Sequence, residues 1–93
     1  MKIIESHKFK LKLRIITSYI KKDKQGASVN FAKDLKKNIK NLNNSPFKYR
    51  PSIYFNNENI RDMTYKGYTI IYKVNIQEKV IVVADIFNQN KPS

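Results

Sequence analysis

The sequence predicts a single α+β domain in which two helices pack on one face of a mainly antiparallel sheet. Three observations predict this fold class. The chain has 93 residues, which is the length of one compact domain. Apolar residues recur at helical spacing through much of the first half. After Pro51 the chain changes to β-branched and aromatic runs that are separated by turn residues, as in strands.

The first half is expected to contain a short strand and then a helix. Residues 2–7 form the candidate strand. The next segment, residues 9–15, alternates as a strand would, but its apolar residues also recur at helical spacing: Phe9, Leu13, Ile16 and Ile20. We predict a helix, because the helical spacing continues after the alternation breaks. The polar residues 21–26, which include a glycine, are expected to separate this helix from the next.

A second amphipathic helix is the clearest element. Its apolar residues are Ala27, Phe31, Leu35, Ile39 and Leu42, and its other faces carry Lys33, Lys36, Lys37 and Lys40. The helix is expected to end at residues 43–46, because asparagine tolerates turn geometry and Pro46 disfavours helix in the residue before it. The two helices would form an antiparallel hairpin with one apolar face and one basic face.

The second half is expected to supply the rest of the sheet, as three or four antiparallel strands. Candidate strands are residues 52–55, 59–65, 68–74 and 80–87, with turns between them. The last of these is apolar on both faces, which suits a strand inside the sheet. The predicted domain covers residues 1–93, and residues 88–93 are expected to form a loose tail.

The charge is large and unevenly distributed. The chain has 19 basic and 7 acidic residues, for a net charge of +12. Residues 1–50 hold 14 Lys and Arg against three acidic residues, which gives +11, whereas residues 51–93 hold 5 against 4, which gives +1. A nucleic acid, an anionic assembly or an acidic protein segment would match the basic half.

Composition excludes several classes of protein. The chain has no cysteine, so disulfides and thiolate zinc sites are excluded. With two glycines, one histidine and scattered acidic residues, it has no phosphate-binding glycine motif and no metal-ligand cluster, and we expect no cofactor. The absence of a long apolar segment predicts a cytoplasmic protein without membrane contact.

Residues 59–74 resemble a motif of the RelE/ParE superfamily of bacterial toxins. The motif has an arginine and an acidic residue, here Arg61 and Asp62, then a hydrophobe, a short turn and an aromatic-led strand that begins at Tyr68. Agreement extends to chain length, basic charge, element order and the segments 46–50 and 86–90. The resemblance covers residues 2–90 and implies the toxin of a type II toxin-antitoxin module, neutralised by a small antitoxin.

For members that cleave mRNA on the ribosome, the resemblance implies a site in which cations and tyrosines surround the reacting phosphate. The residues that could serve here are Arg61, Lys48, Arg50, Tyr65, Lys66 and Lys91. Two departures remove groups that such members tend to use, since Thr69 replaces a usual arginine and Asn88 a frequent histidine. Binding of the target or the antitoxin is assigned to Lys33, Lys36, Lys37, Lys40, Asn88 and Asn90.

Each candidate also has a purely structural interpretation. Arg61 and Asp62 could form a cross-strand ion pair within the sheet. His7 could be a half-exposed residue or a helix cap, and it would be a catalytic base only if the fold brings it beside Arg61. The lysines of the second helix could be a solvated face. Tyr68 and Tyr72, which share one strand face, are expected to pack rather than to stack on RNA.

Three functions remain open. The absence of a base after Phe87 favours a ParE-like inhibitor of DNA gyrase that acts through the helix hairpin and the chain end. The high charge favours a RelE-like, ribosome-dependent mRNA endoribonuclease. The third is a non-toxic nucleic-acid-binding module, which would interleave surface aromatics with its lysines. Expected partners are an antitoxin with an acidic segment and either gyrase or the ribosome with its mRNA, in a homodimer or a toxin-antitoxin hetero-oligomer.

Overall fold

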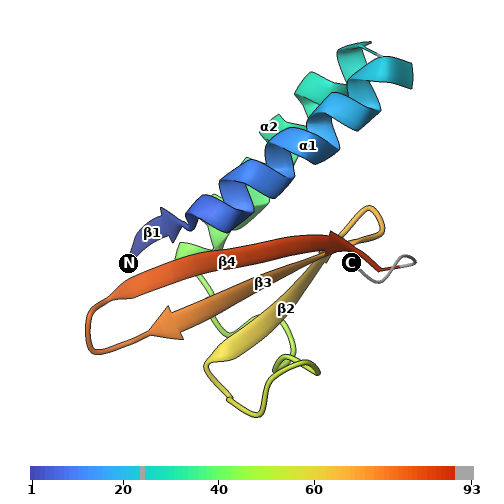
Figure 1. The fold of residues 1–93 in the computed structure, drawn as a ribbon. Helices are drawn as coiled ribbons and strands as arrows, with labels where there is room; N and C mark the ends of the chain where they lie inside the picture. The colour runs from blue at the N-terminus through green and yellow to red at the C-terminus, as the bar shows by residue number, and fades with distance from the viewer. Residues whose placement is uncertain (24, 90–93) are drawn as a thin grey trace.

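The computed structural model describes residues 1–23 and 25–89 as a helix hairpin packed on a four-stranded sheet (Figure 1). The elements, in chain order, are β1 (Lys2–Glu5), α1 (His7–Asp23), α2 (Gln25–Lys40), a 3-10 helix (Asn41–Asn43), β2 (Ile60–Tyr65), β3 (Tyr68–Asn75) and β4 (Val80–Asn88). The strand order is β1-β4-β3-β2. β1 runs parallel to β4 and the other pairs are antiparallel, so the sheet is mixed. The predicted fold class is confirmed.

The helices cover one face of the sheet, as predicted, and the core lies between them. The apolar stripes expected for the two helices are buried there, with Phe9, Leu13, Phe31, Leu35 and Ile39 facing Ile70, Tyr72, Val74, Ile81, Val83 and Ile86. Tyr68 packs against the same core, which confirms the packing role expected for it and for Tyr72. β4 lies inside the sheet, as its apolar sequence indicated.

Helix α1 begins directly after β1, and Ser6 joins the two. The Ser6 hydroxyl accepts a hydrogen bond from the Phe9 backbone N–H at 3.0 Å and donates one to the Ala84 carbonyl at 2.8 Å. Ser6 is therefore the N-cap of the helix. Because Ala84 belongs to β4, the same side chain also ties the start of α1 to the sheet.

The predicted break between the helices at residues 21–26 is wrong in extent. α1 continues to Asp23 and α2 begins at Gln25. Lysines in the last turn of α1 suit the negative end of a helix, so this polar sequence extends the helix instead of ending it. Gly26 lies in the first turn of α2 and lacks the positive φ of a turn glycine.

The predicted strand at residues 52–55 is also wrong. Pro51 and Arg61 form a single bridge, in which the Ser52 N–H donates to the Ile60 carbonyl at 2.7 Å. The next backbone N–H, that of Ile53, donates to the carboxylate of Asp62 at 3.0 Å. The Asp62 side chain thus accepts the hydrogen bond that a neighbouring strand would accept from Ile53. The ladder ends there, and the chain bends away from β2.

The turn between β2 and β3 agrees with expectation, whereas the predicted tail begins too early. Lys66 and Gly67 both have positive φ, 46° and 84°, in the two-residue turn between β2 and β3. β4 includes Asn88, which had been assigned to the tail, and the Gln89 N–H donates to the Gly67 carbonyl at 2.9 Å. Neither α1 nor α2, nor any other helix in residues 1–23 and 25–89, has the length and hydropathy of a membrane span.

Candidate functional site

Arg61 and Asp62, the centre of the sequence motif, point to opposite faces of the sheet. They are neighbours on β2, and side chains alternate along a strand. Arg61 lies opposite Tyr72, a core residue under the helices, whereas Asp62 lies opposite Ile71. Arg61 therefore lies on the helix-covered face of the sheet, and Asp62 lies on the helix-free face.

The Arg61 guanidinium binds backbone carbonyls of the segment before β2. Its Nε donates to the Glu58 carbonyl at 2.8 Å, and its Nη1 donates to the carbonyls of Tyr49 and Phe47 at 2.9 and 3.4 Å. The guanidinium also stacks over the Phe47 ring, 4.7 Å from its centroid. Arg61 is thus a clamp that holds residues 46–58, which we call the clamped segment.

Asp62 holds the same segment from the other face. Its side chain is almost completely buried, and its Oδ2 accepts the Ile53 N–H at 3.0 Å and lies 3.5 Å from Nη2 of Arg50. Its Oδ1 has no hydrogen-bond partner among the described residues. The ion-pair partner of Asp62 is therefore Arg50, and the alternative in which Arg61 and Asp62 pair with each other is wrong.

Tyr72 makes a third attachment from beneath the helices. Its hydroxyl donates to the Pro46 carbonyl at 2.7 Å. Burial raises the pKa of Tyr72 to about 12, although the nearby Arg61 charge acts in the opposite direction. The hydroxyl therefore stays protonated at neutral pH and remains a donor.

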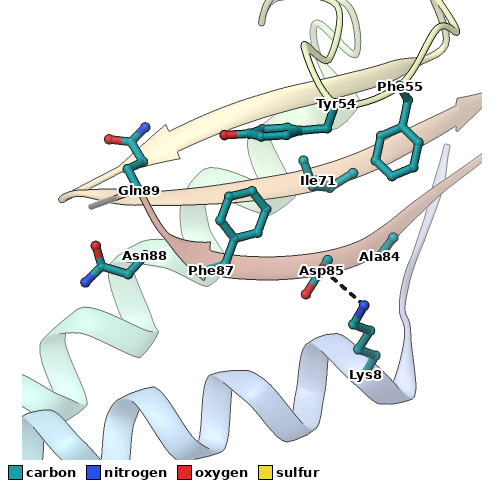
Figure 2. A pocket seen from close by; sticks show the side chains of 9 residues that line it. All are labelled: Lys8, Tyr54, Phe55, Ile71, Ala84, Asp85, Phe87, Asn88 and Gln89. Atoms are coloured by element: carbon teal, nitrogen blue, oxygen red, sulfur yellow. Dashed lines mark ion pairs between the residues drawn. The ribbon is translucent and has the colours of Figure 1, made fainter. Parts of the chain in front are cut away.

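On the helix-free face, the clamped segment forms one wall of a pocket (Figure 2). The pocket has a volume of about 560 Å³ and is bounded mainly by Tyr54 and Phe55 of the clamped segment, Ile71 of β3 and Phe87 of β4. The rings of Tyr54 and Phe87 pack edge to face, with 5.2 Å between their centroids. This contact places the clamped segment against β4.

The rim of this pocket is charged. The Asp85 carboxylate lies 2.8 Å from the Lys12 ammonium and 3.3 Å from that of Lys8, and it also accepts the Ile86 N–H at 2.8 Å. Burial alone would raise the pKa of Asp85, but the hydrogen bonds from Lys12, Ile86 and Lys8 lower it overall. Two lysines share one carboxylate, so the rim is net positive.

The predicted catalytic residues are not gathered in one place. Tyr65 faces the helices, and the centroid of its ring lies 5.2 Å from that of Phe31. Its hydroxyl is buried and has no hydrogen-bond partner in the described part of the chain. Lys66 is in the β2–β3 turn, about 16 Å along the strand from Arg61 by the rise of an extended chain. Lys48 is exposed beside Tyr49, 5.6 Å from its ring.

Two other predicted features can be located. His7 is exposed at the start of α1, which follows β1, whereas Arg61 is on β2 at the opposite edge of the sheet. The fold therefore does not bring this histidine beside Arg61. Lys91 and Asn90 lie outside the described residues. No group of three His, Cys, Asp or Glu side chains within the described residues could hold a metal ion.

The residues assigned to binding fall into two places. The four lysines of the second helix are exposed on the outer side of α2, away from Leu35 and Ile39, and only Lys36 has an ion-pair partner among the described residues, Glu5 at 3.3 Å. Asn88 lines the pocket on the helix-free face. A role for these residues in binding stays a prediction.

The pocket does not follow from the sequence, because residues 52–55 have the composition of a strand. A usable signal was the run Ile53, Tyr54 and Phe55, which is three large apolar residues between turn-forming asparagines and a proline. All three are half or more exposed. Three adjacent large apolar side chains that are all exposed are unusual on a small monomer. They indicate contact with another molecule.

Comparisons with known proteins show the family from the sequence and the fold from a solved structure. The sequence profile of the family described as "ParE toxin of type II toxin-antitoxin system, parDE" matches residues 3–91. A solved structure of the chromosomal ParDE toxin-antitoxin system from P. aeruginosa has the same fold, with a TM-score of 0.78, 17% identity and 95% of each chain covered. No curated protein matches the sequence. Because the profile covers nearly the whole chain, this protein belongs to the ParE toxin family of type II toxin-antitoxin systems.

Proposed function

We propose that this ParE-family toxin arrests growth by binding DNA gyrase through protein contacts, without cleaving RNA. The observation that carries the proposal is the chemistry of the helix-free face. Its pocket is bounded by aromatic and aliphatic side chains, and among the described residues only one exposed cation, Lys8, lies on its rim. Such a surface suits protein side chains better than a phosphate group.

Of the two departures from the RNA-cleaving pattern, Thr69 lies on this face. Asn88 borders the pocket, but it is paired with Tyr68 and its side chain points to the helix-covered side of β4 (Figure 2). Thr69 is buried and lies opposite Phe87, and its hydroxyl has no hydrogen-bond partner within the described residues. An arginine and a histidine at these two positions would have added a phosphate-binding cation and a proton acceptor. Threonine and asparagine supply neither.

The arginine of the motif is engaged elsewhere. Arg61 is bound to three backbone carbonyls on the helix-covered face, and Arg50 is beside the buried Asp62. Transition-state stabilisation requires donors that are fixed in advance with an N–H aimed at the place where charge develops on phosphate. The N–H groups of Arg61 are aimed at carbonyls of the clamped segment, and Arg50 is paired with Asp62 of β2, which supports a mechanism without phosphoryl chemistry.

The basic face of α2 is the surface that we assign to the target. Lys33, Lys37 and Lys40 are exposed and have no ion-pair partner within the described residues. Exposed lysines of this kind mainly accelerate association with an anionic partner, and this acceleration decreases as the salt concentration rises.

The test uses purified toxin in two assays, gyrase supercoiling of relaxed plasmid and cleavage of mRNA on purified ribosomes. We expect inhibited supercoiling and intact mRNA. Replacing Lys33, Lys37 and Lys40 with Glu reverses the charge of this face and should raise the toxin concentration that half-inhibits supercoiling about tenfold. Reversing Lys2, Lys73 and Lys79, which lowers the net charge equally, should have little effect. Cleaved mRNA with active gyrase would instead establish the endoribonuclease alternative.

A further inference from the structure

The pocket on the helix-free face has the properties of a protein docking site. Tyr54 and Phe55 are 51% and 50% exposed, although aromatic rings of this size are normally covered in a small monomer. Aromatic side chains around a hollow are also the commonest anchors in protein interfaces. The hollow of about 560 Å³ can take a large side chain.

The pocket is already formed in the free chain. Its outer wall belongs to the clamped segment, which Arg61, Asp62 and Tyr72 hold by side-chain hydrogen bonds to its backbone. A wall fixed in this way loses little conformational freedom when a partner binds, so more of the contact energy appears as affinity.

The rim indicates the charge of the occupant. The Lys12 side chain is 26% exposed and lies 2.8 Å from Asp85, whereas the Lys8 side chain is 67% exposed and lies 3.3 Å away. Lys8 can therefore turn to a carboxylate of a partner while Lys12 continues to neutralise Asp85. A second copy of this chain, with its net charge of +12, would be repelled.

We propose that this pocket takes an aromatic or branched aliphatic side chain from an acidic segment of the cognate antitoxin, and that a neighbouring carboxylate of that segment pairs with Lys8. The apolar anchor supplies most of the affinity, and the carboxylate fixes the register of the segment. This inference rests on the toxin-antitoxin partnership and not on the choice of gyrase as target.

The test measures the affinity of purified antitoxin, obtained by co-expression with this toxin and separated from it, for toxin variants. Phe55→Ala removes part of the pocket wall, and Ala84→Met places a side chain inside the pocket. Each should weaken binding at least about tenfold. Lys8→Gln should weaken it about fivefold, and more at low salt than at high salt.

Matched controls lie away from the pocket. Ile76→Ala truncates a residue that is 58% exposed in the β3–β4 turn, and Lys10→Gln removes a charge on the same helix as Lys8. Both should bind the antitoxin within about twofold of the parent. Circular dichroism and thermal unfolding establish that every variant is folded. Unchanged antitoxin affinity in folded Phe55→Ala and Ala84→Met would overturn the proposal.

The gyrase assay on the same variants separates this proposal from the proposed function. If Phe55→Ala and Ala84→Met lose gyrase inhibition but retain antitoxin affinity, the pocket binds the target and the antitoxin proposal is overturned. If the parent toxin does not inhibit gyrase but the pocket variants bind antitoxin weakly, the antitoxin proposal stands and the gyrase proposal fails.

Discussion

The two faces of the sheet are covered by different means. On one face, α1 and α2 bury a continuous set of apolar side chains. On the other face, residues 50–55 of the clamped segment lie against the sheet without regular secondary structure and are attached largely through the carboxylate of Asp62. The first face closes completely, whereas the second leaves Tyr54 and Phe55 exposed around a pocket.

This difference shows how a short chain can combine stability with a binding surface. Apolar packing is non-directional and favours the complete burial of every large side chain. Hydrogen bonds to backbone carbonyls are directional, and they can hold a segment in place without burying its side chains. Substitutions on the two faces should therefore have effects of different kind and size.

The largest effect is expected in the helix-covered core. Leu35→Ala should lower the free energy of unfolding by about 4 kcal/mol, because Leu35 is completely buried and truncation leaves a cavity. Urea denaturation measures the change. Val29→Ala on the exposed side of the same helix should cost less than about 0.5 kcal/mol. Similar losses at both positions would show that this face is not a packed core.

Asp62→Ala should have the next largest effect, about 3 kcal/mol, because it leaves the Ile53 N–H and Arg50 without their acceptor. Asp62→Asn keeps an acceptor oxygen and should cost less. If the alanine variant were as stable as the parent, the helix-free face would be held by its apolar contacts alone.

Arg61→Ala should cost about 2 kcal/mol and should also make residues 46–58 sensitive to proteases, since three carbonyls lose their donor. Limited proteolysis followed by mass spectrometry locates the cuts. Loss of toxicity with unchanged protease resistance would contradict the clamp and favour direct contact of Arg61 with the target.

Tyr72→Phe should cost about 1 kcal/mol at pH 7 through the lost hydrogen bond to Pro46. The folded protein holds the Tyr72 proton more tightly than the unfolded chain, with a pKa of about 12 against 10.0. The stabilisation from this group is therefore complete below pH 10 and is lost as the pH rises through 12. Urea denaturation should show a smaller difference between variant and parent at pH 11 than at pH 7.

Asp85→Asn should have the smallest effect, below about 1 kcal/mol at neutral pH, because the ion pairs of Asp85 are partly solvated. The pKa of Asp85 is lowered in the folded state, so its contribution is complete above its ordinary pKa of 3.8 and is lost as the pH falls below that value. The difference between parent and variant should vanish in acid. A difference that persists there would mean that packing, not charge, is involved.

The sequence predicted the fold well because helical spacing is a local signal. Phe9, Leu13 and Leu35 could be assigned to the core from their spacing alone, and the Lys66-Gly67 turn followed from the chemistry of glycine. It predicted the site poorly, because side-chain bonds to backbone carbonyls leave no periodic pattern. The clamp made by Arg61 and the meeting of Tyr54 with Phe87 depend on contacts between distant segments.

The pairing of the first strand with the last has a consequence for synthesis of the protein. β1 joins the sheet only through β4, and the bond from Ser6 to Ala84 spans 78 positions of the chain. During translation β1 therefore has no strand partner until β4 has been made, whereas the cap bond between Ser6 and Phe9 can form early. A nascent chain that lacks β4 cannot complete the sheet, so the toxin fold forms only after both halves of the domain have been made.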